Sequence, residues 1–162
     1  MRVLGIDPGT ATTGWAITEI KNGCLCPVAY GHISTQKGKS EEERLLEISR
    51  DLEKIIDRYR PTEAAVEKIF FFKNQKTVIA VAQARGAVLL TLHRKKVRIF
   101  SYTPLQIKQA LTSYGRAEKK QVQLMTKSIL KLSALPKPDD TADAIAVSVC
   151  HLNSRKLLDL IK

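Results

Sequence analysis

The chain has 162 residues, 44% of them hydrophobic, which is enough for one domain that buries its own core. Its 27 Lys and Arg residues outnumber 16 Asp and Glu residues and give a net charge of +11, so we expect a polyanionic partner. Three cysteines are too few for a disulfide framework, and no apolar run approaches the roughly 18 to 20 residues of a membrane span. We therefore expect residues 1–162 to form a single domain of a cytoplasmic protein without a membrane segment.

The first third of the chain predicts an antiparallel meander. Residues 3–7, 13–20 and 25–33 are apolar or β-branched runs, separated by the turn sequences Pro-Gly-Thr and Lys-Asn-Gly. A capping box at residues 40–43 then opens a helix with apolar residues at helical spacing, which ends before Pro61. A short buried strand is predicted over residues 64–67.

The rest of the chain predicts a helix over 75–93, a strand over 97–101, a helix opened by Thr103-Pro104, and helices over 118–130 and 140–152. This order of elements is typical of an α/β fold with a mixed sheet. The helix over 75–93 is apolar nearly all round, which is more than one core-facing stripe needs. We expect a second copy of the chain to cover part of it.

Two carboxylates stand directly after short apolar strands. Asp7 ends the segment RVLGID, in which alternation places it on the same face as Val3 and Gly5. Glu67 ends the segment EAAVE in the same way. Each has a structural alternative, because Asp before Pro-Gly is a common turn residue and a strand-end Glu is often a solvated rim residue.

A third acidic feature lies in the segment KPDDTADAIAVSVC. Asp140 and Asp143 are three residues apart and share one face of the predicted helix, while Asp139 and Asp140 also suit its N-terminal cap. Capping does not explain Asp143, which lies among small apolar residues suited to packing on a sheet. A charge there costs several kcal/mol unless it is paired or metal-bound, and no basic residue lies near it along that helix.

The four carboxylates Asp7, Glu67, Asp140 and Asp143 predict an oxygen cage for hard cations such as Mg²⁺. Two such ions roughly 4 Å apart activate a water and stabilise the leaving oxygen in phosphoryl displacement. The three histidines, His32, His93 and His151, are isolated and interpreted as surface or core residues, and no Walker loop is present.

The basic residues are concentrated in one segment. Between Arg94 and Lys131 there are ten Lys and Arg residues and one acid, Glu118, whereas the rest of the chain is nearly balanced. A basic block in a balanced protein is typical of binding to a phosphate backbone.

Four segments, GIDPGTATTGWAI, AAVEKIFFFKN with QARG after it, YTPLQIKQALTSYGRAEKKQVQ and PDDTADAIAVSVCH, together resemble the RuvC Holliday junction resolvases of bacteria in order and spacing. The resemblance covers essentially the whole chain. It implies an RNase H-like fold with a five-stranded mixed sheet flanked by helices, a homodimer, and paired Mg²⁺-dependent nicks across a four-way DNA junction, with Mn²⁺ as an alternative metal. It also implies the branch-migration partners RuvA and RuvB.

Carried over by position, the acidic cluster of the family falls on the same four carboxylates. Phe70 matches an aromatic residue that contacts unpaired bases, with core packing as its alternative. Lys108 and Lys119 match basic positions beside the scissile phosphate, where Lys119 would neutralise developing charge. Looser candidates for backbone contacts are Lys76, Arg116 and Lys120.

Three alternatives stay open at this level. The opening motif is also similar to the phosphate loop of actin-like ATPases, although these need two such domains. YqgF-type nucleases share the motif and act on RNA, but the long basic segment and the Asp-x-x-Asp helix favour a resolvase. A third alternative is a basic RNase H-like module that binds branched DNA without cutting it.

Overall fold

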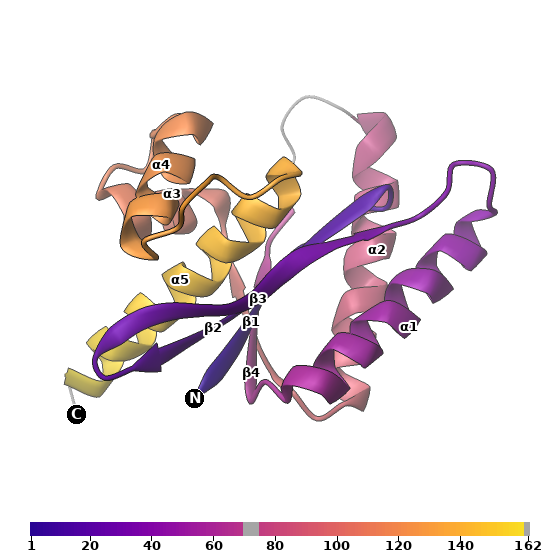
Figure 1. The fold of residues 1–162 in the computed structure, drawn as a ribbon. Coiled ribbons are helices and arrows are strands. Elements are labelled where there is room, and N and C mark those ends of the chain that lie inside the picture. The colour runs from indigo at the N-terminus through magenta and orange to yellow at the C-terminus, as the bar shows by residue number, and fades with distance from the viewer. Residues whose placement is uncertain (70–74, 161–162) are drawn as a thin grey trace.

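A five-stranded mixed sheet forms the centre of the molecule (Figure 1). The computed structural model describes the backbone of residues 1–69 and 75–160 and the side chains of residues 1–69 and 78–155. The strands are β1 (Arg2–Asp7), β2 (Thr12–Lys21), β3 (Cys24–Ser34), β4 (Glu63–Glu67) and β5 (Arg98–Tyr102), in the spatial order β3-β2-β1-β4-β5. The first three strands form the predicted antiparallel meander, whereas β1, β4 and β5 run parallel to one another. The predicted α/β class is confirmed.

Helices cover both faces of this sheet (Figure 1). α1 (Glu41–Tyr59) and α2 (Gln75–Arg94) lie on one face, and α5 (Asp139–Leu160) crosses the other with α3 (Pro104–Thr112) and α4 (Lys119–Ile129) beside it. The capping box predicted at residues 40–43 is present at Ser40 in α1, and Thr103 forms a second one at the start of α3. The last helix continues to Leu160, past the predicted end at residue 152.

Strand alternation separates two apolar cores. Leu4 and Ile6 of β1 pack with α1 and α2, whereas Val3 packs with α3, α4 and α5. In β4, Val66 belongs to the first core and Ala65 to the second. Because side chains alternate along a strand, the residues that follow, Asp7 and Glu67, face α5.

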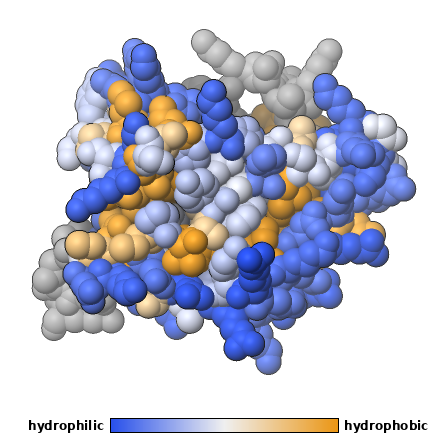
Figure 2. Space-filling model, viewed as in Figure 1, coloured by the Kyte–Doolittle hydropathy of each residue, from blue (hydrophilic) through white to orange (hydrophobic). Residues whose placement is uncertain are grey.

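The surface differs between these layers. Figure 2 shows a hydrophilic outer face on α1 and apolar residues gathered over α3 and α4. The exposed apolar side chains of α3 and α4 are Leu105, Leu124 and Met125. Among the described residues, no helix is both long enough and apolar enough to cross a membrane.

A buried polar chain fastens α5 to the sheet. The hydroxyl of Tyr102 lies 2.7 Å from Nδ1 of His151, and Nε2 of His151 lies 2.8 Å from a carboxylate oxygen of Glu63. Burial lowers the pKa of His151, so its neutral form accepts from Tyr102 and donates to Glu63. The interpretation of His151 as a core residue is confirmed, since its side chain is fully buried.

Candidate metal centre and nucleic-acid interface

The predicted carboxylates meet at one edge of the sheet. Asp7 and Glu67 end the parallel neighbours β1 and β4, and the strand register pairs Ile6 with Val66 directly before them. Asp140 and Asp143 lie in the first turns of α5, which crosses this edge. Carboxylate oxygens of Asp7, Asp140 and Asp143, here called the acidic triad, all lie within 4.8 Å of one another. Glu67 stands beside the triad, within hydrogen-bonding reach of Asp7.

Two glycines allow α5 to come this close. Gly14 of β2 is paired with Asp7, and the carbonyl group of Asp140 lies where a β-carbon on Gly14 would be. Gly5 of β1 similarly faces the carbonyl of Ala144 and the side chain of Ser148. Any side chain at these positions would lift α5 away from the sheet. The glycines therefore bring the helix carboxylates to the end of β1.

Burial and mutual repulsion raise the pKa values of these carboxylates. Burial raises the pKa of Asp7 to about 8, with further contributions from Glu67, Asp143 and Asp140. Burial and then Asp143 raise the pKa of Glu67 to about 7, against the opposing effect of its hydrogen bond to Asp7. The pKa of Asp140 is raised by the same two causes in the same order. A half-buried set of repelling carboxylates is the environment that a divalent cation stabilises, and the all-oxygen donor set fits Mg²⁺.

The one cation in contact with the triad comes, among the described residues, from another helix. Nζ of Lys119, at the start of α4, lies 2.9 Å from Oδ2 of Asp143 and 3.3 Å from Oδ2 of Asp139. Burial tends to lower the pKa of Lys119, but its bonds to Asp143 and Asp139 prevail and raise it. No basic residue lies near Asp143 along α5, and α4 supplies Lys119 in its place.

A cavity of about 230 Å³ opens beside the carboxylates. Its polar lining consists of Glu67, Asp143, Lys108 and Lys119, and α3, α4 and α5 contribute the apolar remainder. A cavity lined by carboxylates and by two lysines suits a phosphate group, because metal ions held by the carboxylates and the lysine ammonium groups can both contact its oxygens.

The structure describes only some of the other residues that were predicted to contact nucleic acid. Arg116 is exposed in the segment before α4, and Lys120 is exposed in the first turn of α4, next to Lys119 in the chain. Phe70 lies outside the described residues. The backbone of Lys76 is in α2, but its side chain also lies outside the described part of the chain.

The basic segment from Arg94 to Lys131 divides into two parts in the fold. Lys95 pairs with Asp57 at 2.7 Å, Arg98 with Glu63 at 3.2 Å, and Arg94 lies 3.6 Å from Glu53. These residues surround the start of β5. The triad lies at the other end of the parallel strands. The charge of these basic residues is compensated by acids of α1 and β4. From Lys108 onward, Lys119 pairs with Asp143 and Asp139, whereas Lys108, Arg116, Lys120, Lys127 and Lys131 form no ion pair among the described residues.

Sequence reasoning assigned no role to two residues that contact the strand ends. Thr10 donates from its hydroxyl to the carbonyl of Ala80 in α2, and Arg85 of α2 donates to the carbonyl of Glu67. One sequence signal could have pointed to Arg85, because it is the single charged residue between positions 77 and 92 of an otherwise mostly apolar helix.

A mixed five-stranded sheet with carboxylates at neighbouring strand ends and on a crossing helix defines an RNase H-like nuclease fold. The profile of the family described as crossover junction endodeoxyribonuclease RuvC matches residues 3–151. The chain belongs to this RuvC family. The family match decides against the actin-like and YqgF-type alternatives.

Relatives and solved structures agree with this assignment. A crossover junction endodeoxyribonuclease RuvC of Caldanaerobacter subterraneus is 49% identical over 98% of this chain and 96% of its own. Another, from Syntrophomonas wolfei, is 49% identical over 100% of this chain and 94% of its own. The structure of Thermus thermophilus RuvC in complex with a Holliday junction substrate superposes with a TM-score of 0.91 at 32% identity, covering 97% of this chain and 96% of that one.

Proposed function

We propose that this protein is a structure-selective endonuclease that resolves four-way (Holliday) DNA junctions by paired, symmetric, metal-dependent nicks in homologous recombination and DNA repair. The observation that carries the proposal is the meeting of the acidic triad and Glu67 beside a cavity with two lysines. Membership of the RuvC family supports the substrate. In this proposal residues 1–162 act as one nuclease domain in the cytoplasm.

The four carboxylates Asp7, Glu67, Asp140 and Asp143 would hold Mg²⁺, as two ions per site, with Mn²⁺ as an alternative. The bound metal would supply a lower pKa for the attacking water and stabilisation of charge on the departing 3′ oxygen. The carboxylates also orient this water in line with the leaving oxygen. The product is a nick with a 5′ phosphate that a ligase can seal.

The lysines act on the phosphate itself. Lys119 lies in the cavity and already contacts Asp143, so its ammonium group can neutralise the charge that develops on the scissile phosphate. Lys108 lines the same cavity and would contact the same or the next phosphate. Arg116, Lys120 and Lys76 are proposed to contact the flanking backbone, and Phe70 the unpaired bases at the crossover.

We propose a homodimer in which α2 forms the seam. Ile79 and Leu90 are 68% and 62% exposed on α2, and Ala82 and Gly86 lie exposed between them. A β-carbon on Gly86 would meet no atom within 4 Å. Small residues between two apolar ones on a helix face allow close helix contact, and a twofold dimer would place one site on each of two opposed strands. RuvA and RuvB are the proposed branch-migration partners.

The test uses a labelled four-way junction and a linear duplex with the same arms, each with Mg²⁺ or EDTA, resolved on a denaturing gel. We expect symmetric nicks in opposed strands of the junction alone, and only with Mg²⁺. Asp140→Asn is expected to abolish cutting and leave junction affinity within about twofold, because phosphate contacts supply most of the affinity. Tight binding without cutting under any divalent metal would show a junction-binding module instead.

A further inference from the structure

α2 contacts the ends of both strands that carry buried carboxylates. Thr10, three residues after Asp7, donates from Oγ1 to the carbonyl oxygen of Ala80 at 2.7 Å. Arg85, little more than one turn further along α2, donates from Nε to the carbonyl oxygen of Glu67 at 3.1 Å. One helix therefore holds the chain segments that carry Asp7 and Glu67, through hydrogen bonds with the loop after β1 and with the backbone at the end of β4.

Arg85 links three elements. Besides the carbonyl of Glu67 in β4, its terminal nitrogen donates to Oγ of Ser101 in β5 at 3.0 Å. A planar guanidinium presents two donors in a fixed geometry, so it fixes both strand ends relative to α2. A lysine at this position keeps the charge but has a single donor group that satisfies only one of these acceptors at a time with good geometry.

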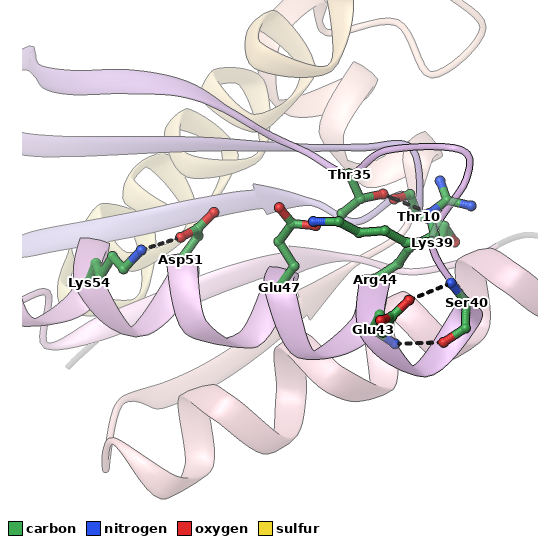
Figure 3. A network of polar contacts seen from close by, with 9 residues as sticks. All are labelled: Thr10, Thr35, Lys39, Ser40, Glu43, Arg44, Glu47, Asp51 and Lys54. Atoms are coloured by element: carbon green, nitrogen blue, oxygen red, sulfur yellow. Dashed lines mark hydrogen bonds and ion pairs between the residues drawn. The ribbon is translucent and has the colours of Figure 1, made fainter.

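Thr10 is itself held from a second direction. Its carbonyl accepts a hydrogen bond of 2.6 Å from Oγ1 of Thr35, and Nε of Arg44 in α1 donates to that same hydroxyl at 2.8 Å (Figure 3). The loop after Asp7 is thus anchored to α2 through a side chain and to α1 through its backbone.

We propose that Thr10 and Arg85 are positioning residues through which α2 sets the spacing of Asp7 and Glu67 for metal binding. The carboxylates repel one another, and this repulsion acts to move the ends of β1 and β4 apart. Hydrogen bonds from α2 to the adjacent backbone oppose that movement. Metal ligands need placement within about 0.5 Å, so loss of either anchor weakens metal binding although no ligand is removed. This inference rests on the proposed function of the carboxylates.

The first test compares Arg85→Lys with the matched control Arg94→Lys, a change in the same helix far from the triad. We measure kcat, KM and the Mg²⁺ concentration for half-maximal cleavage of a four-way junction, with sedimentation to verify the oligomeric state. For Arg85→Lys we expect kcat to fall and the Mg²⁺ requirement to rise, each by about 10- to 100-fold, as for other residues that orient metal ligands. KM for the junction is expected to stay within about twofold, since phosphate contacts are intact. The control is expected to match the wild type.

The second test isolates the hydroxyl of Thr10. Thr10→Val removes the donor with little change in shape, and we expect the same pattern as for Arg85→Lys with a smaller, about 10-fold effect. Thr10→Ser keeps a hydroxyl and is expected to restore kcat relative to Thr10→Val. This pair also keeps the inference falsifiable if Arg85→Lys fails to fold.

Three outcomes are distinguishable. If both variants lower only the melting temperature, while kcat and the Mg²⁺ requirement stay at wild-type values, the residues are structural anchors and the inference is wrong. If the wild type does not cut junctions, the proposed function fails. In that case Mg²⁺ binding measured by calorimetry on the wild type and Arg85→Lys still decides the inference: equal affinities would overturn it, and a weaker variant would support it.

Discussion

The carbonyl group of Asp140 occupies the position that a β-carbon on Gly14 would need, and Gly14 is the residue of β2 that pairs with Asp7. The first turn of α5 therefore lies directly on β2. The absence of a side chain at residue 14 determines how near Asp140 comes to Asp7, and hence whether the acidic triad exists.

Gly14→Ala is expected to move α5 away from the sheet. Overpacking a close contact costs about 1 to 3 kcal/mol, so we expect a lower melting temperature together with a loss of cleavage of at least about 10-fold. Gly38→Ala is the matched control, since a β-carbon on Gly38 meets nothing within 4 Å. Cleavage and Mg²⁺-induced stabilisation are measured on both. Wild-type cleavage by Gly14→Ala would show that the close contact does not set the triad.

Asp7→Asn is expected to stabilise the metal-free protein at high pH. The folded-state pKa of Asp7 is raised from 3.8 to about 8, so folding favours its protonated form. That contribution is complete below pH 4 and is lost as the pH rises to about 8, because the buried group must then ionise. We expect Asp7→Asn to melt a few degrees above the wild type in EDTA at pH 8, with a smaller difference at pH 5.

The measurement is thermal unfolding in EDTA at several pH values, compared as the difference between variant and wild type. His151 also changes the stability with pH, because its lowered pKa destabilises the fold as the pH falls below the ordinary value of 6.5. This effect is the same in variant and wild type, so it cancels in the difference. Adding Mg²⁺ at pH 8 is expected to raise the melting temperature of the wild type only. A difference that does not change with pH would contradict the raised pKa of Asp7.

Lys119→Gln separates metal binding from catalysis. The ammonium group contacts Asp143 and so competes with a metal ion for this carboxylate. We expect cleavage to fall by about 100-fold, as when one preorganised charge-stabilising group is lost, while Mg²⁺ binds at least as tightly as to the wild type. Lys120→Gln, a change of the exposed neighbour, is expected to weaken junction binding slightly and reduce its salt slope by about 1. Weaker Mg²⁺ binding by Lys119→Gln would indicate that Lys119 organises the carboxylates instead.

Leu90→Glu is expected to disrupt the proposed dimer seam on α2. A charge on this exposed apolar stripe would be desolvated in a dimer, so we expect a monomer by sedimentation at micromolar concentration. Leu46→Glu on α1, where the leucine is 49% exposed, serves as the control and is expected to leave the oligomeric state unchanged. The monomer is expected to lose the symmetry of paired nicks. A wild type that sediments as a monomer would itself exclude this seam.

Local sequence patterns were sufficient to predict the helices and strands and to select the candidate carboxylates. Asp7 ends an apolar strand, and Asp143 lies within an apolar helix. A carboxylate is unusual in either setting, and a window of about ten residues is enough to see this. The small residues even indicate which faces meet. Gly5 lies on the same face of β1 as Asp7, and the start of α5 is rich in alanine, so this face of β1 is expected to pack against α5. Strand-end position and helix spacing placed Glu67 and Asp140 in the same predicted cluster, and the resemblance agreed with that choice.

Contacts between distant segments were not predictable in this way. The basic segment around Lys95 has no acid near it in sequence, yet α1 supplies Asp57 as its partner. His151 likewise seemed isolated, although Glu63 and Tyr102 satisfy both of its ring nitrogens. The anchoring of Glu67 by Arg85 also depends on how α2 packs on β4, which no local pattern specifies.

The packing of α5 across β1 and β2 has a consequence for synthesis of the chain. Asp7 is made among the first residues, but Asp140 and Asp143 reach it only after every strand has been translated and α5 has docked. A growing chain holds at most Asp7 and Glu67, too few oxygen ligands for a hydrolytic site. We therefore expect incomplete chains to have no nuclease activity, which would begin only when the fold is complete.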